Sequence, residues 1–323
     1  MTPVLVTGGA GYIGSHTAKA LSAAGFLPVA YDNLFRGHRW AVQFGPFVEG
    51  DIRDGEAVRQ AIRTHRIEAI VHFAALAYVG ESVSQPGLYF SNNVEGLGSV
   101  LDAAAQENVR SVVFSSSCAT YGDPERLPVD ETCRQEPVSP YGETKLIGEH
   151  LLKWFEQSNG IRSAALRYFN ASGDDPDGHL GEDHDPETHL IPSAILAAMG
   201  RRPPLDLYGT DYPTRDGTAE RDYVHVCDLA SAHVAALKHL LAGGESLALN
   251  LGSGHGSTVR EVISMVEKVS GSRVPCVEQP RRAGDAVALY AAGDKARSTL
   301  GWATEQSDLE YICRTAWNWH SKR

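Results

Sequence analysis

Short apolar runs alternate with longer segments of helical periodicity throughout the first half of the chain. The apolar runs predict strands at residues 3–8, 27–32, 67–75 and 110–117. The segments between them predict helices at residues 15–25, 56–66 and 96–108. Strands that alternate with helices of about 10–15 residues are typical of βαβ units, in which helices cover both faces of a parallel sheet. The pattern therefore predicts an α/β fold built on a Rossmann-type, doubly wound parallel sheet.

The alternation stops after residue 170, where a stretch rich in Gly, Asp and Pro predicts a long loop at 171–192. Beyond it, a smaller C-terminal α/β lobe is predicted from segments at 191–202, 227–243, 246–253 and 258–271. We interpret residues 1–172 as the Rossmann domain, extended by parts of 224–252, and residues 173–323 as the second lobe. A ligand is expected between the two.

The composition is that of an ordinary globular protein, since 42% of the 323 residues are apolar and 21% are charged. A net charge of −11 argues against binding to nucleic acid or to an anionic membrane surface. No apolar run reaches the length of a membrane span, about 18 residues, and the first residues predict a strand and not a signal peptide. The five cysteines form no CxxC pair, which favours a reducing compartment. We expect a cytoplasmic protein.

Gly8, Gly11 and Gly14 lie between the first predicted strand and the first predicted helix. Glycines there allow a sharp turn and a close approach to a pyrophosphate, and the helix N-terminus directs N–H groups at the phosphates. Asp32 ends the second predicted strand, at the spacing of a carboxylate that binds the adenine ribose hydroxyls. The pattern predicts a dinucleotide site that prefers NAD to NADP, although Arg36 is close enough in sequence to contact a 2′-phosphate.

Two further strand ends suit a cofactor but also have an ordinary structural explanation. Asp51 and Ile52 follow a third short strand, where an acid can meet an adenine amino group or simply close an Asx turn. Phe73 and Ala74 follow the next strand, where small residues let a cofactor lie against the backbone. The stretch that contains them suits core packing equally well.

Tyr141 and Lys145 are four residues apart in the segment YGETK, so on a helix they share one face. They are either a solvated surface pair or a catalytic pair in which the ammonium lowers the pKa of the phenol. Ser115, Ser116 and Ser117 end a buried strand, where a single serine is often a helix cap. Three serines fit better with a hydroxyl directed at a ligand, because open α/β sheets bind ligands at the carboxyl edge of the strands.

Together, the glycine turn, Asp32, the serine strand end and the YxxxK motif resemble the extended short-chain dehydrogenase/reductase superfamily. More narrowly, the chain resembles the UDP-glucose (UDP-galactose) 4-epimerases, with matching stretches in the same order along nearly its whole length. These stretches are TGGAGYIGSH, DNL, GDIRD, VGESV, NNVEG, FSSSCATYG, SPYGETK, LRYFN, LIP, GTDYPTRDGTAERDYVHVCDLA, NLGSG and PRRAGD. Their order and spacing favour the catalytic explanation of the Tyr–Lys pair.

The resemblance implies an isomerase that interconverts UDP-galactose and UDP-glucose in galactose and nucleotide-sugar metabolism. Tyr141 is expected to remove the proton of the sugar 4-OH, Ser117 to share that proton, and Lys145 to favour the phenolate and bind the nicotinamide ribose. The hydride of C4 passes to NAD and returns to the other face of a transient 4-keto sugar. No net oxidation results, so NAD is expected to stay bound.

The remaining site residues are assigned by the resemblance alone, with residues 1–172 as the NAD-binding part and 173–323 as the UDP-sugar lobe. Expected cofactor contacts are Gly8, Gly11, Tyr12, Ile13, Gly14, Asp32, Asn33, Asp51, Ile52, Phe73, Ala74, Asn92, Ser117, Tyr141, Lys145 and Phe169. Expected substrate contacts are Ser117, Tyr141, Asn170, His189, Leu190, Leu207, Tyr208, Arg221, Arg282, Asp285 and Leu289. The two arginines suit a pyrophosphate, because a guanidinium fork matches phosphate oxygens.

Three departures from the family pattern leave the preferred sugar open. Ala77 stands where many bacterial epimerases have lysine, and relatives that resemble UDP-arabinose/UDP-xylose 4-epimerases share this alanine. His189 replaces a common asparagine, and Leu289 replaces a bulky tyrosine at the sugar-pocket gate, although Tyr290 is adjacent. A pentose or an N-acetylhexosamine therefore remains an alternative to the hexose.

Other activities of the superfamily fit less well. Dehydratases and decarboxylases carry acids just after the position of Ser117, where this chain has Cys118 and Ala119. A catalytically idle NAD-binding scaffold would be expected to have lost Tyr141 or Lys145. We expect no metal site, because the histidines and acids of HLGEDHDPETH (179–189) lie in a Gly/Pro/Asp-rich loop that predicts solvated side chains. The resemblance implies a homodimer, through the helix expected at 92–107 and the helix that carries Tyr141.

Overall fold

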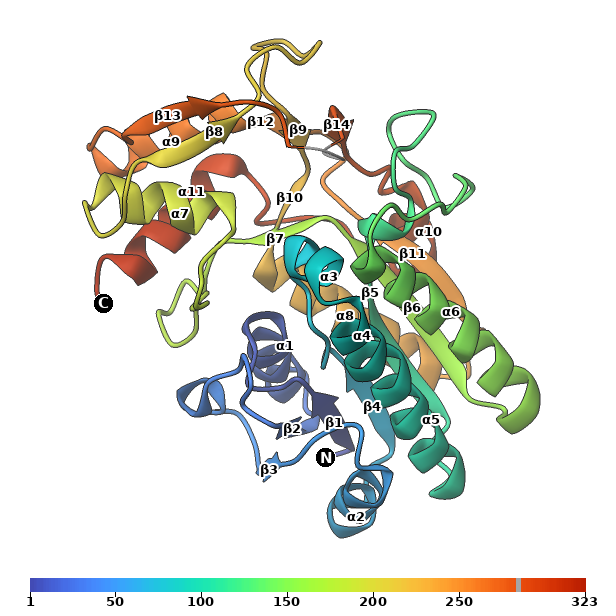
Figure 1. Cartoon of the computed structure of the whole chain (residues 1–323). Coiled ribbons are helices and arrows are strands. Elements are labelled where there is room, and N and C mark those ends of the chain that lie inside the picture. Colours follow the sequence, from blue (N-terminus) through green and yellow to red (C-terminus); the bar gives the residue numbers. More distant parts are fainter. Residues whose placement is uncertain (283–285) are drawn as a thin grey trace.

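A seven-stranded parallel sheet lies between two layers of helices (Figure 1). The chain is described by a computed structural model over residues 1–282 and 286–323. The sheet contains β1 (Pro3–Thr7), β2 (Leu27–Asp32), β3 (Phe47–Glu49), β4 (Ala69–His72), β5 (Ser111–Ser117), β6 (Arg162–Tyr168) and β11 (Leu247–Leu251). Its order is β11-β6-β5-β4-β1-β2-β3, and every neighbouring pair is parallel. The predicted Rossmann-type doubly wound sheet is confirmed.

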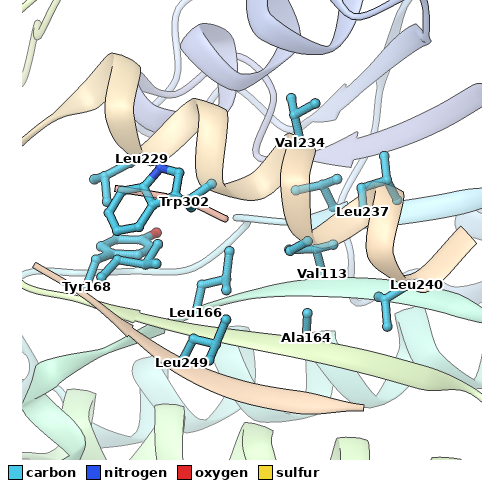
Figure 2. Close-up of a cluster of buried hydrophobic side chains, with 14 of the residues drawn as sticks. Val113, Ala164, Leu166, Tyr168, Leu229, Val234, Leu237, Leu240, Leu249 and Trp302 are labelled. Atoms are coloured by element: carbon cyan, nitrogen blue, oxygen red, sulfur yellow. The ribbon is translucent and has the colours of Figure 1, made fainter. Parts of the chain in front are cut away.

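Each face of the sheet has its own hydrophobic core. One face is covered by α1 (Tyr12–Ala23) and α8 (Val226–Leu241), and the other by α2 (Gly55–His65), α5 (Gly96–Gln106) and α6 (Pro140–Asn159). Figure 2 shows side chains of α8 packed onto those of β5, β6 and β11, among them Leu229, Leu237, Val113, Leu166 and Leu249. Burial of each such side chain stabilises the fold by about 1.5–3 kcal/mol.

The sheet also takes in elements from beyond the predicted long loop. Strand β11 pairs with β6, with Leu247 opposite Ala164, and α8 packs against α1. Both elements fall within 224–252, the region that was expected to extend the first domain. The division between residues 172 and 173 stays a prediction.

The rest of the second half forms a separate core. Its helices are α7 (Leu190–Ala198), α9 (Val259–Ser270) and α11 (Leu309–His320), packed around Val262, Ile312 and Ala316. Its strands form small sheets, β8 (Leu205–Tyr208) with β13 (Cys276–Gln279), and β9 (Glu220–Arg221) with β12 (Ser257–Thr258) and β14 (Ala288–Leu289). The remaining strands and α-helices of the described residues are β7 (Asn170–Ser172), β10 (Tyr223–His225), α3 (Val79–Ser84), α4 (Pro86–Tyr89) and α10 (Asp294–Leu300).

Helix α6 begins where the sequence of its first turn directs it to begin. Ser139 is the N-cap and accepts a hydrogen bond from Gly142 N at 3.1 Å, and Pro140 occupies the first helical position. Tyr141 therefore lies in the first turn and Lys145 one turn further on. Among the described residues, no helix has both the length and the apolar character that crossing a membrane requires.

Candidate active site

The glycine turn between β1 and α1 has the shape and the open N–H groups of a phosphate site. Gly8 has a φ of +73°, in the left-handed region, and a Cβ on Gly14 would lie only 2.1 Å from the Gly8 carbonyl oxygen. Gly11 is the N-cap of α1, and no side chain caps the helix there. The N–H groups of the first turn and the helix dipole thus face a place that suits an anion. These residues fit the pyrophosphate of a dinucleotide.

Asp32 joins the glycine turn to the end of β2. Its carboxylate, 8% exposed, accepts hydrogen bonds from Ala10 N at 3.0 Å and from Leu34 N at 2.8 Å. Burial raises its pKa, and the two N–H donors act in the opposite direction. Each oxygen keeps a lone pair that can accept a hydrogen bond from a ribose hydroxyl.

Arg36 and Asp51 are already engaged within the protein. The Arg36 guanidinium donates to Glu81 at 2.9 Å and to the Asp185 carbonyl at 2.8 Å. Asp51 accepts from Arg53, whose hydrogen bonds hold the pKa of that carboxyl well below its usual range, and from Asn33 Nδ2 at 3.1 Å. The pairing of Arg36 removes the sequence-based reason for considering a 2′-phosphate contact.

The other predicted cofactor residues border the same strand ends. Ile13 and Phe73 pack against the core of the α8 face, and Ile52 is buried in the opposite core. Ala74 N donates to Thr7 O at 3.1 Å. The rest are Tyr12, whose hydroxyl donates to Gly173 O, Asn92 in the π-helical segment Phe90–Glu95, and Phe169, which is 8% exposed.

Tyr141 and Ser117 meet where α6 starts above the end of β5. A Cβ on Gly142 would lie 2.5 Å from Ala119 O, so a glycine is required for this close approach of the helix to the strand end. The Ser117 side chain is close enough to the Tyr141 hydroxyl to act on its pKa. Burial raises the pKa of Tyr141 to about 12, and Ser117 acts in the opposite direction.

Lys145 is buried directly beside this pair. It is 3% exposed, its Nζ donates to Ser115 O at 2.6 Å, and Nζ lies 5.8 Å from the centre of the Tyr141 ring. Burial lowers the pKa of Lys145 to about 7, against the effect of Glu149. The sequence predicted that this ammonium would lower the pKa of Tyr141. In the protein alone the pKa of Tyr141 is raised instead, because burial outweighs the opposite effect of Ser117.

A buried polar network under Lys145 was missed from the sequence. Glu149, one turn beyond Lys145 on α6, accepts hydrogen bonds from Ser116 Oγ at 2.6 Å and from Arg167 Nε at 2.8 Å. Arg167 also donates to the Tyr121 hydroxyl at 2.8 Å. The four-residue spacing that drew attention to Tyr141 and Lys145 holds again for Glu149, so the same rule applied once more would have found it.

The predicted substrate residues gather on the second lobe and its border. The Arg282 guanidinium lies 3.9 Å from the centre of the Tyr208 ring, and Arg221 is paired in register with Leu289. The others are Asn170, which donates to Asp222 O at 2.9 Å, the buried Leu207, and His189 and Leu190 at the start of α7. Asp285 lies outside the described residues.

Two observations link this lobe to the catalytic strand end. Burial raises the pKa of Cys118, which follows Ser117, to about 12, while Arg221 is close enough to act in the opposite direction. Leu289 packs against a small cluster that contains Phe169 and Tyr121. The predicted cofactor and substrate sets therefore adjoin each other here.

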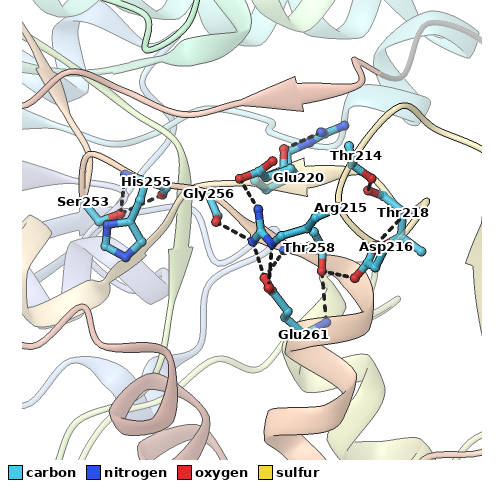
Figure 3. Close-up of polar contacts among 11 residues, drawn as sticks. Thr214, Arg215, Asp216, Thr218, Glu220, Ser253, His255, Gly256, Thr258 and Glu261 are labelled. Atoms are coloured by element: carbon cyan, nitrogen blue, oxygen red, sulfur yellow. Dashed lines mark hydrogen bonds and ion pairs between the residues drawn. The ribbon is translucent and has the colours of Figure 1, made fainter.

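Arg215, within the matching stretch around Arg221, has a structural role. Figure 3 shows its guanidinium held by Glu220 at 2.7 Å, by the Gly256 carbonyl at 2.9 Å and by Glu261. Glu261 also belongs to the capping box of α9. These contacts fix β9, and with it Arg221, against the rest of the lobe.

The loop at 179–189 is only in part solvated as the sequence predicted, because His179, Asp185 and His189 are exposed whereas Glu182 is buried. Glu182 is 3% exposed, its backbone N donates to Asp174 Oδ1 at 2.6 Å, and Trp319 Nε1 donates to its carbonyl at 3.1 Å. Burial alone would lower the pKa of His184, but its hydrogen bonds to Glu182 and Glu187 raise it to about 9. The loop is folded over charged groups, and its composition gave no sign of this.

Comparison with known proteins gives a consistent result over nearly the whole chain. Residues 4–252 match the NAD dependent epimerase/dehydratase family. The UDP-glucose 4-epimerase of Rhizobium leguminosarum bv. trifolii is 52% identical over 319 residues, which cover 99% of this chain and 97% of that protein.

Two solved structures are similar in fold as well. The UDP-glucose 4-epimerase of Brucella ovis in complex with NAD is 53% identical, with 98% of each chain covered and a TM-score of 0.97. The UDP-glucose-4-epimerase of Stenotrophomonas maltophila, with bound NAD and formylated UDP-arabinopyranose, is 40% identical over 100% of this chain and 98% of that chain, with a TM-score of 0.96.

Proposed function

The chain belongs to the NAD dependent epimerase/dehydratase family, and we propose that it is a UDP-sugar 4-epimerase that interconverts UDP-galactose and UDP-glucose with NAD as cofactor. The resemblance recognised in the sequence is confirmed by relatives of that name over nearly the full length. The observation that carries the catalytic assignment is the position of Tyr141 next to Ser117, with the buried Lys145 Nζ 5.8 Å from the centre of the Tyr141 ring.

Tyr141 and Ser117 divide the proton work at the sugar 4-OH. The Tyr141 oxygen accepts the proton of the 4-OH, and the Ser117 hydroxyl relays or shares it. C4 becomes a ketone only when its hydride is lost as well. After the 4-keto sugar has rotated to present its other face, the same two hydroxyls return the proton to O4. NAD, when bound, supplies the acceptor and then the donor of the hydride at C4.

Ionisation of Tyr141 needs more positive charge than the protein alone supplies. Burial raises the pKa of this phenol to about 12 and lowers that of Lys145 to about 7. A cation near both groups favours the phenolate, and a nicotinamide ring in its oxidised form carries such a charge. We infer that Tyr141 becomes an effective base only when cofactor is bound, so the sugar loses its proton only while NAD is in the site.

The cofactor and substrate contacts follow from the same arrangement. Gly8, Gly11 and Gly14 with the α1 N-terminus would hold the pyrophosphate, and Asp32 the adenine ribose. On the substrate side, Arg221, Arg282 and Tyr208 would hold the UDP group. Asp285 remains part of this proposal as the residue that binds the uridine ribose.

A UDP-pentose is the second candidate substrate. Ala77 is the residue that suggested it in the sequence, and the Stenotrophomonas relative was solved with formylated UDP-arabinopyranose. The smaller Leu289 at the gate supports an N-acetylhexosamine in addition. Whichever of these three sugars is the substrate, the presence of Tyr141 and Lys145 argues against a catalytically idle scaffold.

We also propose that the chain works as a cytoplasmic homodimer through the outer faces of α5 and α6. These helices pack side by side at one edge of the molecule (Figure 1). Trp154, on the outer side of α6, is 64% exposed. A large exposed aromatic residue of this kind is typical of the centre of an interface.

Conversion of UDP-galactose by wild type and by Tyr141→Phe tests the catalytic assignment. The variant keeps the ring and removes only the hydroxyl, so kcat should fall by about 10²–10⁴-fold, the contribution of a general base. Its content of bound NAD should be unchanged. Tyr311→Phe, on α11, is the matched control and should retain activity. Equal activity of Tyr141→Phe and wild type would refute the assignment.

A further inference from the structure

Four metal-ligating side chains converge in the loop between β7 and α7. Glu182, His184, Glu187 and His189 each offer one donor atom, and these four atoms all lie within 4.8 Å of one another. The side chains of both glutamates are nearly buried, at 4% and 9% exposure, while the histidines are 18% and 46% exposed. Part of the cluster is thus shielded from water while one side stays accessible.

The four nitrogen-to-oxygen distances within the cluster are compatible with a four-coordinate transition-metal site. His184 Nδ1 lies 3.1 Å from Glu182 Oε1 and 3.6 Å from Glu187 Oε2. His189 Nδ1 lies 2.7 Å from Glu182 Oε1 and 2.9 Å from Glu187 Oε1. A tetrahedral zinc ion bonded to N and O donors at about 2.0–2.1 Å places neighbouring donors about 3.3 Å apart. The observed distances bracket that value.

The histidines of this cluster face more carboxylate oxygens than they can donate hydrogen bonds to. Each Nδ1 carries at most one proton, yet each faces an oxygen of both carboxylates. Across the part of the chain that the structure describes, neither Glu182 nor Glu187 forms an ion pair with a lysine or an arginine. Two protonated histidines would balance the two nearly buried carboxylates, and a divalent cation bound by all four groups would take the place of those two protons.

A neighbouring cluster shows the alternative solution. Asp175, Asp177 and His179 also lie close together, but there Lys19 Nζ is bonded to both aspartates, at 2.6 Å each. An internal ammonium already occupies the place of a cation in that group. The two clusters therefore differ, because among the described residues no lysine is bonded to the glutamate–histidine group.

We propose that Glu182, His184, Glu187 and His189 bind one zinc-class divalent ion. Two imidazoles with two carboxylates suit zinc better than magnesium or calcium, which prefer oxygen donors only. The ion lies beside the glycine turn, since the Tyr12 ring is 6.2 Å from the His184 ring, edge to face. The ion would hold the start of α7 against the glycine turn between β1 and α1. Because it would bind His189 through Nδ1, the Nε2–H of His189 would remain free to donate a hydrogen bond. This proposal differs from the sequence-based expectation that the chain has no metal site.

Metal binding by the untagged full-length protein tests the proposal. The protein, with its bound cofactor, is treated with a chelator, dialysed and titrated with Co²⁺ as a spectroscopic probe for zinc. We expect one Co²⁺ per chain with the intense visible absorption of four-coordinate cobalt, its displacement by Zn²⁺, and a rise in Tm with either metal. Loss of an outer-shell partner weakens metal sites by about 10–100-fold, so loss of a direct ligand in His184→Ala should weaken binding at least as much.

The variants are chosen so that misfolding does not imitate the expected result. Glu187→Gln changes one oxygen to an amide with little change of shape, and it should also lose tight binding while its Tm without metal stays near that of wild type. His179→Ala, in the neighbouring cluster, should bind as wild type does. A wild type that binds no Co²⁺, or binds it without the four-coordinate spectrum, or binds it equally well as His184→Ala, would show an ion-pair cluster only and overturn the proposal.

Discussion

Replacement of Arg167 by methionine removes the cation of a buried ion pair next to the catalytic lysine. Arg167 bonds both carboxylate oxygens of Glu149, at 2.8 and 2.5 Å, and the two side chains are 7% and 9% exposed. In the variant, Glu149 keeps the Ser116 hydroxyl at 2.6 Å as a donor but loses its positive partner. A charge left buried without its partner lowers the free energy of unfolding by about 3–5 kcal/mol.

The effect on Tm follows from the size of the chain. The entropy of unfolding is about 2.1 cal/mol/K per residue, which gives about 0.7 kcal/mol/K for the 323 residues. A loss of about 4 kcal/mol thus lowers Tm by about 6 °C. Thermal unfolding followed by circular dichroism, with NAD in excess for every variant, measures this shift.

An exposed pair supplies the matched control. Lys268 and Glu310 form an ion pair with side chains 62% and 41% exposed, so Lys268→Met should cost less than about 1 kcal/mol. The double variant Glu149→Gln/Arg167→Met should be more stable than Arg167→Met, because it no longer buries an uncompensated charge. If Arg167→Met lost no more stability than Lys268→Met, the pair could not lie in a dry interior and the reasoning would fail.

Three further predictions follow from the same structure. Because the pKa of Lys145 is about 7 in the fold and 10.5 ordinarily, the unfolded chain binds one proton more between these values. The free energy of unfolding of NAD-stripped wild type should therefore rise with pH relative to that of Lys145→Met, by up to about 1.4 kcal/mol per pH unit. Urea unfolding at pH 7 and at pH 9 measures this, and the same difference between the two proteins at both pH values would contradict it. Leu289→Tyr should lower the rate with UDP-N-acetylglucosamine relative to UDP-glucose, and an unchanged ratio would remove the gate hypothesis. Trp154→Glu should convert a dimer to monomers in sedimentation velocity, and an unchanged sedimentation coefficient would exclude this face as the interface.

The fold was predictable because strand and helix periods alternate regularly in the first half. Four buried apolar runs with helices between them admit little other than a parallel sheet covered on both faces. The addition of β11 and α8 was harder to predict, since both follow a long irregular stretch and only their pairing with β6 and α1 fixes their place.

The candidate site was predictable where its residues are close in sequence. Tyr141 and Lys145 share a helix face, and Ser117 ends a strand at the ligand edge of the sheet. Arg167 could not be assigned to Glu149 in this way, because its partner comes from a different element and is chosen by packing.

Burial explains two places where the structure differs from the sequence-based expectations. The pKa of Tyr141 depends on how completely the fold removes its hydroxyl from water, which spacing along a helix does not reveal. Likewise, a Gly/Pro/Asp-rich composition suggested a solvated loop around Glu182, whereas Glu182 itself is buried and its carbonyl accepts a hydrogen bond from Trp319 of the C-terminal helix.

The most direct test of the epimerase assignment is proton NMR of UDP-galactose incubated with the purified chain and no added NAD. We predict that the anomeric signal of UDP-galactose gives way to a mixture rich in UDP-glucose, because a cofactor that is regenerated in every cycle stays bound. Parallel incubations with UDP-arabinopyranose and UDP-N-acetylgalactosamine rank the alternative sugars. If no sugar were converted, even after NAD was supplied, the proposed function would be contradicted.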